Sequence, residues 1–253
     1  MIPRLAVGLL FASLSTSLAA WTLTSSDPAD GAPRGLSVFE AHIADGDRQA
    51  TLTGLVFNEK AHTLRVIDSP SPGQTRLAET LAGIAAIAGV NGSYFHEDMR
   101  PVGLMVANGE EIHPFEKAKL LAGVLTVRPG KIDIVRSSRF EPGKNLREAL
   151  QCGPMLIEDG VPVAGLNSER NARRTVVATD GRGRWALIYL TSVTLADSAN
   201  ILLLPGLLGD WTPRTALNLD GGGSSGLWVN STPVALSRPE FSNVRNYLAV
   251  FPK

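Results

Sequence analysis

The sequence predicts an α+β protein, a single domain built from antiparallel or mixed sheets with many hairpins and a few helices. Its 253 residues, of which 44% are hydrophobic and 19% charged, are typical of a folded chain with a sizeable core. Short β-prone runs separated by turn residues recur along the chain, whereas only two segments have helical spacing of apolar residues. Because strands and helices do not alternate regularly, a doubly wound fold or a β/α barrel is the weaker interpretation. The 25 glycines and 16 prolines argue against a coiled coil or helical solenoid.

Residues 1–19 are expected to be a signal peptide. A positively charged start with Arg4 precedes an apolar run at 5–18, and Ser17-Leu18-Ala19 resembles a cleavage site of small residues. The run is shorter than the roughly 20 apolar residues that a membrane span needs, and no later segment is long and apolar enough. We therefore expect an exported protein, periplasmic or secreted, with no stable membrane span after cleavage.

The remaining elements are predicted in chain order. A β-rich part at 20–80 should hold strands at 36–43, 50–57 and 63–67, and apolar spacing predicts a helix over 77–85. Thr194 to Asp197 has the pattern of a capping box and should open a second helix that Pro205 ends. Hairpins are expected around Asn108-Gly109 and around 128–131, 158–160 and 180–183, and further strands at 87–90, 101–107, 216–219, 226–229 and 247–251.

Charge and cysteine content exclude several functions. The 24 basic and 24 acidic residues balance, so there is no general electrostatic reason to bind nucleic acid. Cys152 is the only cysteine, so neither an internal disulfide nor a zinc site of four cysteines can form. A cysteine nucleophile stays open because four histidines are present, although burial as a small apolar residue is the favoured interpretation.

The densest candidate for chemistry is the stretch from Asn218 to Gly226, in which a strand runs into Asp220, three glycines and two serines. A hairpin turn needs only two such residues, so the longer run favours a ligand loop whose backbone N–H groups face an anion. The run also matches the G-x-S-x-G pattern of serine hydrolases at Ser224. That pattern requires a helix after the serine and a later histidine, whereas in this chain a strand follows and all four histidines precede Ser224.

Three other segments carry polar groups suited to a site. Asn91 to Asp98 contains an amide, hydroxyls, a ring and two carboxylates at the end of a strand, and Gln151 to Met155 leads into another strand through Gly153-Pro154. Arg170, Arg173 and Arg174 cluster before Thr175, where guanidinium groups would suit a phosphate or carboxylate. Each signal is weak alone, because strand ends are often turns and arginine clusters are often solvated.

Taken in this order, the segments resemble the phosphodiester glycosidase family over roughly residues 81–251. Asn218 to Ser224 is similar to the family's Asn-Leu-Asp-Gly-Gly-Gly-Ser, which is the most specific match. The other matches are Asn91-Gly92-Ser93-Tyr94-Phe95, Pro101-Val102-Gly103-Leu104, Cys152-Gly153-Pro154-Met155-Leu156 and Arg173-Arg174-Thr175. Two departures are Ser93, where the family has glycine, and Ala178-Thr179, which replaces a glycine. They bear on the substrate more than on the fold.

The resemblance implies a catalytic region at 81–253 that hydrolyses a sugar-1-phosphodiester bond in an envelope or extracellular glycan. Such a site needs positive charge and N–H donors on the phosphate and a carboxylate near the anomeric carbon. We assign Asp220 as the nucleophile or base, with Glu97 or Asp98 as the second carboxylate. Substrate binding is assigned to Asn91, Tyr94, Arg174, Asn218, Gly221, Gly222 and Ser224.

The residues leave two alternatives open. One is a non-catalytic glycan-binding or polysaccharide-export accessory, and the other is a serine esterase that uses Ser224. No cofactor is established by the sequence; a divalent cation beside Asp220 is left open, since no spacing of ligands defines one. The expected partner is a glycan or sugar phosphate.

Overall fold

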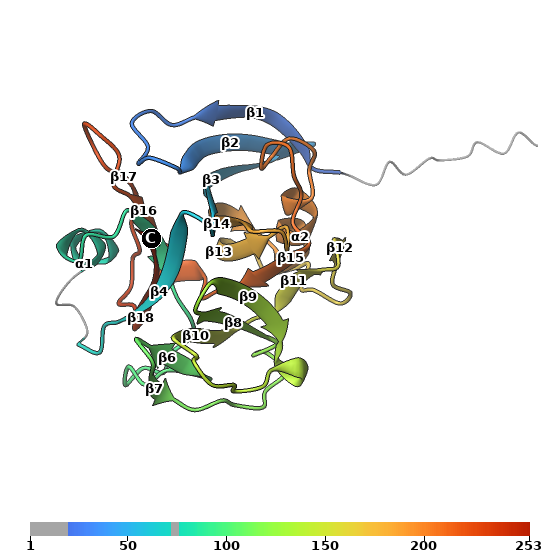
Figure 1. Cartoon of the computed structure of the whole chain (residues 1–253). Coiled ribbons are helices and arrows are strands. Elements are labelled where there is room, and N and C mark those ends of the chain that lie inside the picture. Colours follow the sequence, from blue (N-terminus) through green and yellow to red (C-terminus); the bar gives the residue numbers. More distant parts are fainter. Residues whose placement is uncertain (1–19, 72–75) are drawn as a thin grey trace, which may run out of the picture.

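The computed structural model describes residues 20–71 and 76–253, so the predicted signal peptide lies outside the described residues. Three sheets make up the fold, and every strand pairing within them is antiparallel. Figure 1 shows the largest sheet running from β1 at the top toward β12 at the right, with the other two sheets below and to the left. The predicted α+β class with antiparallel sheets and few helices is confirmed.

Within each sheet, the spatial order of the strands differs from their order in the chain. Neighbour by neighbour, the eight-stranded sheet contains β1 (Thr22–Pro28), β2 (Ser37–Asp45), β3 (Arg48–Asn58), β14 (Arg184–Val193), β13 (Ala172–Thr179), β15 (Thr215–Asn218), β11 (Met155–Glu158) and β12 (Val161–Pro162). The second contains β7 (Glu110–His113), β6 (Met105–Ala107), β10 (Glu148–Cys152), β8 (Gly123–Arg128) and β9 (Lys131–Arg136). The third contains β17 (Leu236–Arg238), β16 (Leu227–Val229), β5 (Ala88–Asn91), β18 (Asn246–Pro252) and β4 (His62–Asp68).

Two α-helices accompany the sheets, α1 (Leu77–Gly83) and α2 (Leu195–Leu202). The capping box predicted for α2 is present, since the Thr194 hydroxyl accepts a hydrogen bond from the Asp197 N–H at 3.0 Å and Asp197 accepts one from the Thr194 N–H at 3.3 Å. Single 3₁₀ turns lie at Ser137–Arg139 and Gly222–Ser224. No helix among the described residues is long and apolar enough to cross a membrane.

Several predicted boundaries need correction. The strand expected at 101–107 is regular only over β6, because Pro101 has no N–H to donate and Gly103 has a φ of 79°. The hairpin at Asn108-Gly109 is confirmed, with φ values of 52° and 83° as its turn type requires. Strands β1, β10 and β17 were not predicted.

One apolar cluster joins all three sheets. It contains Leu55 from β3, Leu125 from β8 and Val90 from β5, and each is 1% exposed or less. A second cluster lies on the other face of the large sheet, where α2 covers it with Ile201 and Leu202. The burial of these apolar faces fixes the ends of β5, β13 and β15 relative to one another, and these ends carry the candidate site.

Candidate active site

The polar segments singled out in the sequence meet at one pocket with a volume of about 480 Å³. β13 and β15 are paired in the large sheet, and the turn between β10 and β11 adds Pro154 to the pocket wall. The lining side chains and backbone come from Tyr94, Leu120, Pro154, Asn167, Arg170, Ala172, Arg174, Leu195, Asn218 and Asp220 to Gly223. The fold therefore places the arginine cluster beside the acid and glycines of the loop.

Asn91 fastens the loop that carries Asp220. Its side-chain amide donates to the Asp220 carbonyl at 2.7 Å, and its oxygen accepts from the Thr175 hydroxyl at 2.6 Å and the Gly226 N–H at 3.0 Å. Asn91 is fully buried and does not line the pocket, because these three bonds occupy its side chain. The structure thus places Asn91 behind the site. There it joins β5 and β13 to the loop that runs from Asp220 to Gly226, which is called the glycine loop below.

The turn after Asn91 is held against β18 by Asn246. The Asn246 side-chain oxygen accepts from the Ser93 N–H at 2.8 Å, and the Asn246 carbonyl accepts from the Gly92 N–H at 2.8 Å. A Cβ at Gly92 would lie 1.8 Å from the Asn246 side-chain oxygen, so only glycine fits. The Gly92 carbonyl in turn accepts from the Asp220 N–H at 3.0 Å, which links this turn to the candidate acid.

Asp220 is a partly buried carboxylate with a raised pKa. Burial is the main cause, because it disfavours the charged form. Hydrogen bonds from the Ser224 hydroxyl and from the Gly221 N–H, the latter at 2.8 Å, lower the pKa and offset part of this effect. Such a carboxylate is a better proton acceptor than a solvated aspartate.

Arg174 brings a positive charge to the same pocket without an acidic partner. It is 8% exposed, and its Nε and one terminal nitrogen donate to the backbone carbonyls of Val193 and Arg170 at 3.1 and 2.7 Å. No carboxylate among the described residues forms an ion pair with it. Burial lowers its pKa and the nearby charge of Arg170 lowers it further, so two like charges share this pocket. The two guanidinium groups together favour a bound anion.

Asn218 lines the pocket, and its side chain is fixed by its surroundings. Its side-chain nitrogen donates to the carbonyls of Leu219 and Gly153 at 2.6 and 2.9 Å, and lies 3.3 Å from the Tyr94 hydroxyl. Its side-chain oxygen is buried and has no partner in the described chain. The Tyr94 hydroxyl donates to the Gly153 carbonyl, and burial raises the pKa of this phenol, so Tyr94 stays neutral. An unpartnered buried oxygen is costly, so the surrounding contacts must hold Asn218 in place.

The glycine loop offers fewer free donors than the sequence suggested. The Gly221 N–H binds the Asp220 side chain, and the Ser224 N–H donates to the Gly221 carbonyl at 3.2 Å. The N–H groups of Gly222 and Gly223 have no partner among the described residues, and both glycines line the pocket. The available backbone donors are therefore those of Gly222 and Gly223.

The two carboxylates expected to assist Asp220 lie elsewhere. Glu97 and Asp98 are exposed and outside the pocket wall, and Asp98 is paired with Arg100 at 2.7 Å, which lowers the pKa of Asp98. Asp220 is the only carboxylate among the described residues that line this pocket.

Ser224 also lies behind the pocket wall, with its hydroxyl 3.5 Å from that of Ser242. None of the histidines lines the pocket, so Ser224 has no histidine base there. Cys152 is fully buried, and burial raises the pKa of its thiol, which keeps it protonated. Across residues 20–71 and 76–253, no three His, Cys, Asp or Glu side chains come together as a metal site.

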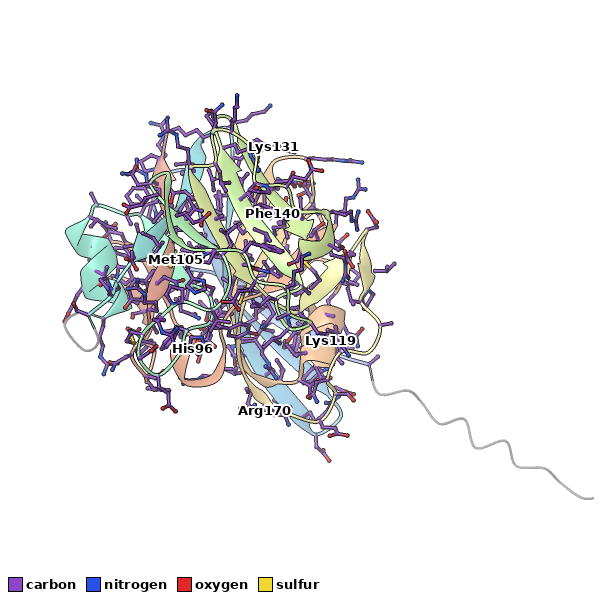
Figure 2. All side chains as sticks on the ribbon, turned by 90° about the horizontal axis from the view of Figure 1, so that it is seen from below. His96, Met105, Lys119, Lys131, Phe140 and Arg170 are labelled. Atoms are coloured by element: carbon purple, nitrogen blue, oxygen red, sulfur yellow. The ribbon has the colours of Figure 1, made fainter. Side chains whose placement is uncertain are left out.

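Sequence reasoning missed several residues of the site. Arg170 was noted in the arginine cluster but given no role, and Asn246 gave no signal because it stands alone in an apolar strand. Asn167 orders the loop before β13 by accepting from the Arg170 N–H at 2.8 Å. Figure 2 shows Lys119 and Arg170 in the lower half of the view and Lys131 at its top.

Comparison with known proteins gives a family. Residues 85–251, which include every residue lining the pocket, match the family model described as phosphodiester glycosidase. A curated relative, the uncharacterized protein YigE of Escherichia coli K12, is 32% identical over a match that covers 37% of this chain and 35% of that protein.

Three solved structures share the fold at 14–16% sequence identity. A hypothetical protein from Synechocystis gives a TM-score of 0.64 over 87% of this chain, which spans 62% of that protein. The zebrafish N-acetylglucosamine-1-phosphodiester alpha-N-acetylglucosaminidase catalytic domain, auto-inhibited by its pro-peptide, gives 0.63 over 90% of this chain and 88% of that one. A protein from Burkholderia pseudomallei K96243, described as exported, gives 0.59 over 81% and 74%.

Proposed function

The chain belongs to the phosphodiester glycosidase family, and on that premise we propose that it is an exported enzyme that hydrolyses a sugar-1-phosphodiester bond in an envelope or extracellular glycan. One observation carries the proposal. The buried guanidinium of Arg174, which has no acidic partner among the described residues, shares a pocket with Asp220 and with a second cation, Arg170. A phosphodiester supplies the missing negative charge. Its glycosidic bond contains an electrophilic anomeric carbon, at which a carboxylate can assist the attack of a nucleophile.

In the proposed complex, the phosphodiester accepts hydrogen bonds from Arg174 and from the N–H groups of Gly222 and Gly223. The sugar lies against Asn218 and Asp220, which both line the pocket. This orientation turns the anomeric carbon toward Asp220. The backbone of Asp220 is fixed by Asn91 and by Gly92, so the carboxylate needs little reorganisation to act.

The reaction proceeds by attack of water on the anomeric carbon. Asp220 accepts a proton from the water, whose oxygen bonds to the carbon while the bond from carbon to phosphate oxygen breaks and its electron pair leaves with the phosphate. The departing phosphate is a stable anion held by Arg174, so the step needs no protonated carboxylate as general acid. A single carboxylate in the pocket is therefore sufficient for this leaving group.

The test is sugar release from UDP-GlcNAc and from a panel of sugar-1-phosphodiesters by the wild type, Asp220→Asn and Arg174→Met. Arg182→Met is the matched control, because Arg182 is exposed and lies outside the pocket. The proposal expects release by the wild type and the control and its loss in both site variants, with thermal unfolding showing that these are folded. Release that survives Asp220→Asn would contradict the assigned chemistry. Substrate binding without release in the wild type would favour the glycan-binding accessory role.

Export is the second part of the proposal. It is supported by the sequence pattern of residues 1–19, and the chain that follows them is anchored from Trp21 onward. The Trp21 indole donates to Asp197 at 2.8 Å, and the Arg48 guanidinium lies 4.7 Å from its ring centroid. Fractionation of cells that express the full chain, with N-terminal sequencing of the product, tests this part. A product that starts at residue 20 outside the cytoplasm is expected, and an uncleaved cytoplasmic chain would contradict it.

A further inference from the structure

A second cavity of about 500 Å³ adjoins the pocket that contains Arg174 and Asp220, which is called the phosphate pocket below. The two cavities share four lining residues, Leu120, Pro154, Asn167 and Leu195. One ligand can therefore extend from the phosphate pocket into the second cavity while it stays in contact with the protein. Lys119 lines the second cavity and Arg170 lines the phosphate pocket, and both lie in the lower half of the view in Figure 2. The second cavity therefore offers space for a group esterified to a phosphate bound in the first.

The walls of this second cavity are mainly apolar. Beyond the shared residues they include Met155, Val163, Ala164 and Leu166. Leu120, which forms part of the boundary with the phosphate pocket, is 54% exposed. Exposed apolar side chains that gather around a cavity indicate a binding site for apolar groups.

Two of the three polar side chains that line the second cavity, Arg136 and Asn167, already have partners, and the third is Lys119. Arg136 is paired with Glu158 on β11. The side-chain oxygen of Asn167 accepts from two backbone N–H groups, those of Glu169 and Arg170, at 3.3 and 2.8 Å. A sugar or polyol in this cavity would lose its hydrogen bonds to water and find few replacements, which is unfavourable.

We propose that this cavity binds an apolar aglycone, so that the preferred substrates are sugar-1-phosphodiesters of long-chain alcohols. The inference rests on the proposed function and adds the chemical class of the group on the far side of the phosphate. In such a substrate, Arg174 holds the phosphodiester and the hydrocarbon chain passes Leu120 into the second cavity. Each methylene group buried there strengthens binding by about fourfold.

Two synthetic substrates with the same sugar 1-phosphate test the inference. One carries an n-octyl ester and the other an ether chain of the same length with oxygens in place of methylene groups. The wild type should hydrolyse the octyl substrate with a KM at least about tenfold lower, since only a few buried methylene groups are needed for that ratio. Equal KM values would overturn the inference and leave the proposed glycosidase activity intact.

A pair of variants locates the preference. Ala164→Asp places a carboxylate in the second cavity, whereas Val161→Asp places one on β12, where Val161 is 60% exposed and does not line the cavity. Ala164→Asp should abolish the octyl preference, and Val161→Asp should keep it. A preference that survives Ala164→Asp would overturn the assignment of the cavity.

Binding separates this inference from the proposed function. If neither ester is hydrolysed, calorimetric titration with octyl phosphate and with the matched ether phosphate still measures the cavity directly. At least about tenfold tighter binding of octyl phosphate, lost in Ala164→Asp, would support the apolar site although the glycosidase proposal had failed. Equal binding of the two phosphates would overturn the apolar site as well.

Discussion

Replacement of Asn91 by alanine is expected to destabilise the protein by about 3 kcal/mol, because the substitution leaves three groups without partners. These are the Thr175 hydroxyl, the Gly226 N–H and the Asp220 carbonyl. Each buried polar group that loses its hydrogen bond costs about 1 kcal/mol at the lower end of measured values. For a chain of this size, the total corresponds to a fall of about 6–12 °C in the temperature of unfolding.

Urea denaturation followed by tryptophan fluorescence measures the change in the free energy of unfolding. Thr175→Val removes only one of the three bonds and should cost about 1 kcal/mol. Asn230→Ala is the control, because Asn230 is exposed and its side chain makes no hydrogen bond in the described structure, so its effect should stay within about 0.5 kcal/mol. A loss of less than about 1 kcal/mol for Asn91→Ala would refute the assignment of Asn91 as the fastening residue of the loop.

Four further outcomes follow from the site. Because burial raises the pKa of Asp220, activity should fall on acidification at a pH above the ordinary aspartate pKa of 3.8. A pH profile of kcat/KM measures this, and an acidic limb at or below pH 3.8 would contradict the raised pKa of Asp220. The same shift means that the charged carboxylate costs stability as the pH rises through the folded-state pKa. Asp220→Asn should therefore unfold at a higher temperature than the wild type at pH 7, and this advantage should vanish below the unfolded-state pKa in calorimetric scans. Arg174→Met should lower kcat/KM by about 100-fold or more in steady-state assays, because it removes the charge that faces the leaving phosphate, and a change below about fivefold would exclude that role. With one carboxylate in the pocket, proton NMR of the first product formed should show an inverted anomeric configuration, and a retained one would require a second catalytic group.

The sequence predicted the class of fold because its signals were local. Turn pairs such as Asn108-Gly109 and the capping box at Thr194 determine their own backbone conformation through φ preferences and side-chain hydrogen bonds. The three strands that were missed lack such signals. β1 is a Ser- and Thr-rich edge strand, exposed over most of its length, and β10 is buried at every residue, so neither shows a clear alternation of apolar and polar residues. Tertiary packing determines them.

The same distinction applies to the site. The residues of the glycine loop were found because several unusual residue types stand together in the sequence. From the sequence, Asn91 was assigned to sugar binding, whereas the structure buries this residue among three strands. Its placement depends on pairing between segments that are distant in the sequence. Glu97 and Asp98 were chosen for being near Asn91 in sequence, yet the turn that follows β5 directs them to the surface. Arg170 and Asn246 reach the site or its support through long-range contacts that no local pattern records.

Hydrolysis in water enriched in ¹⁸O tests the central claim most directly, because it reports which bond breaks. The proposed mechanism attacks the anomeric carbon, so the heavy oxygen should appear in the released sugar and be absent from the phosphate product, as mass spectrometry of both products will show. Asp220→Asn should abolish the incorporation. Heavy oxygen in the phosphate product would mean that the phosphorus–oxygen bond is cleaved, and would contradict the assignment of this pocket to glycosidic bond hydrolysis.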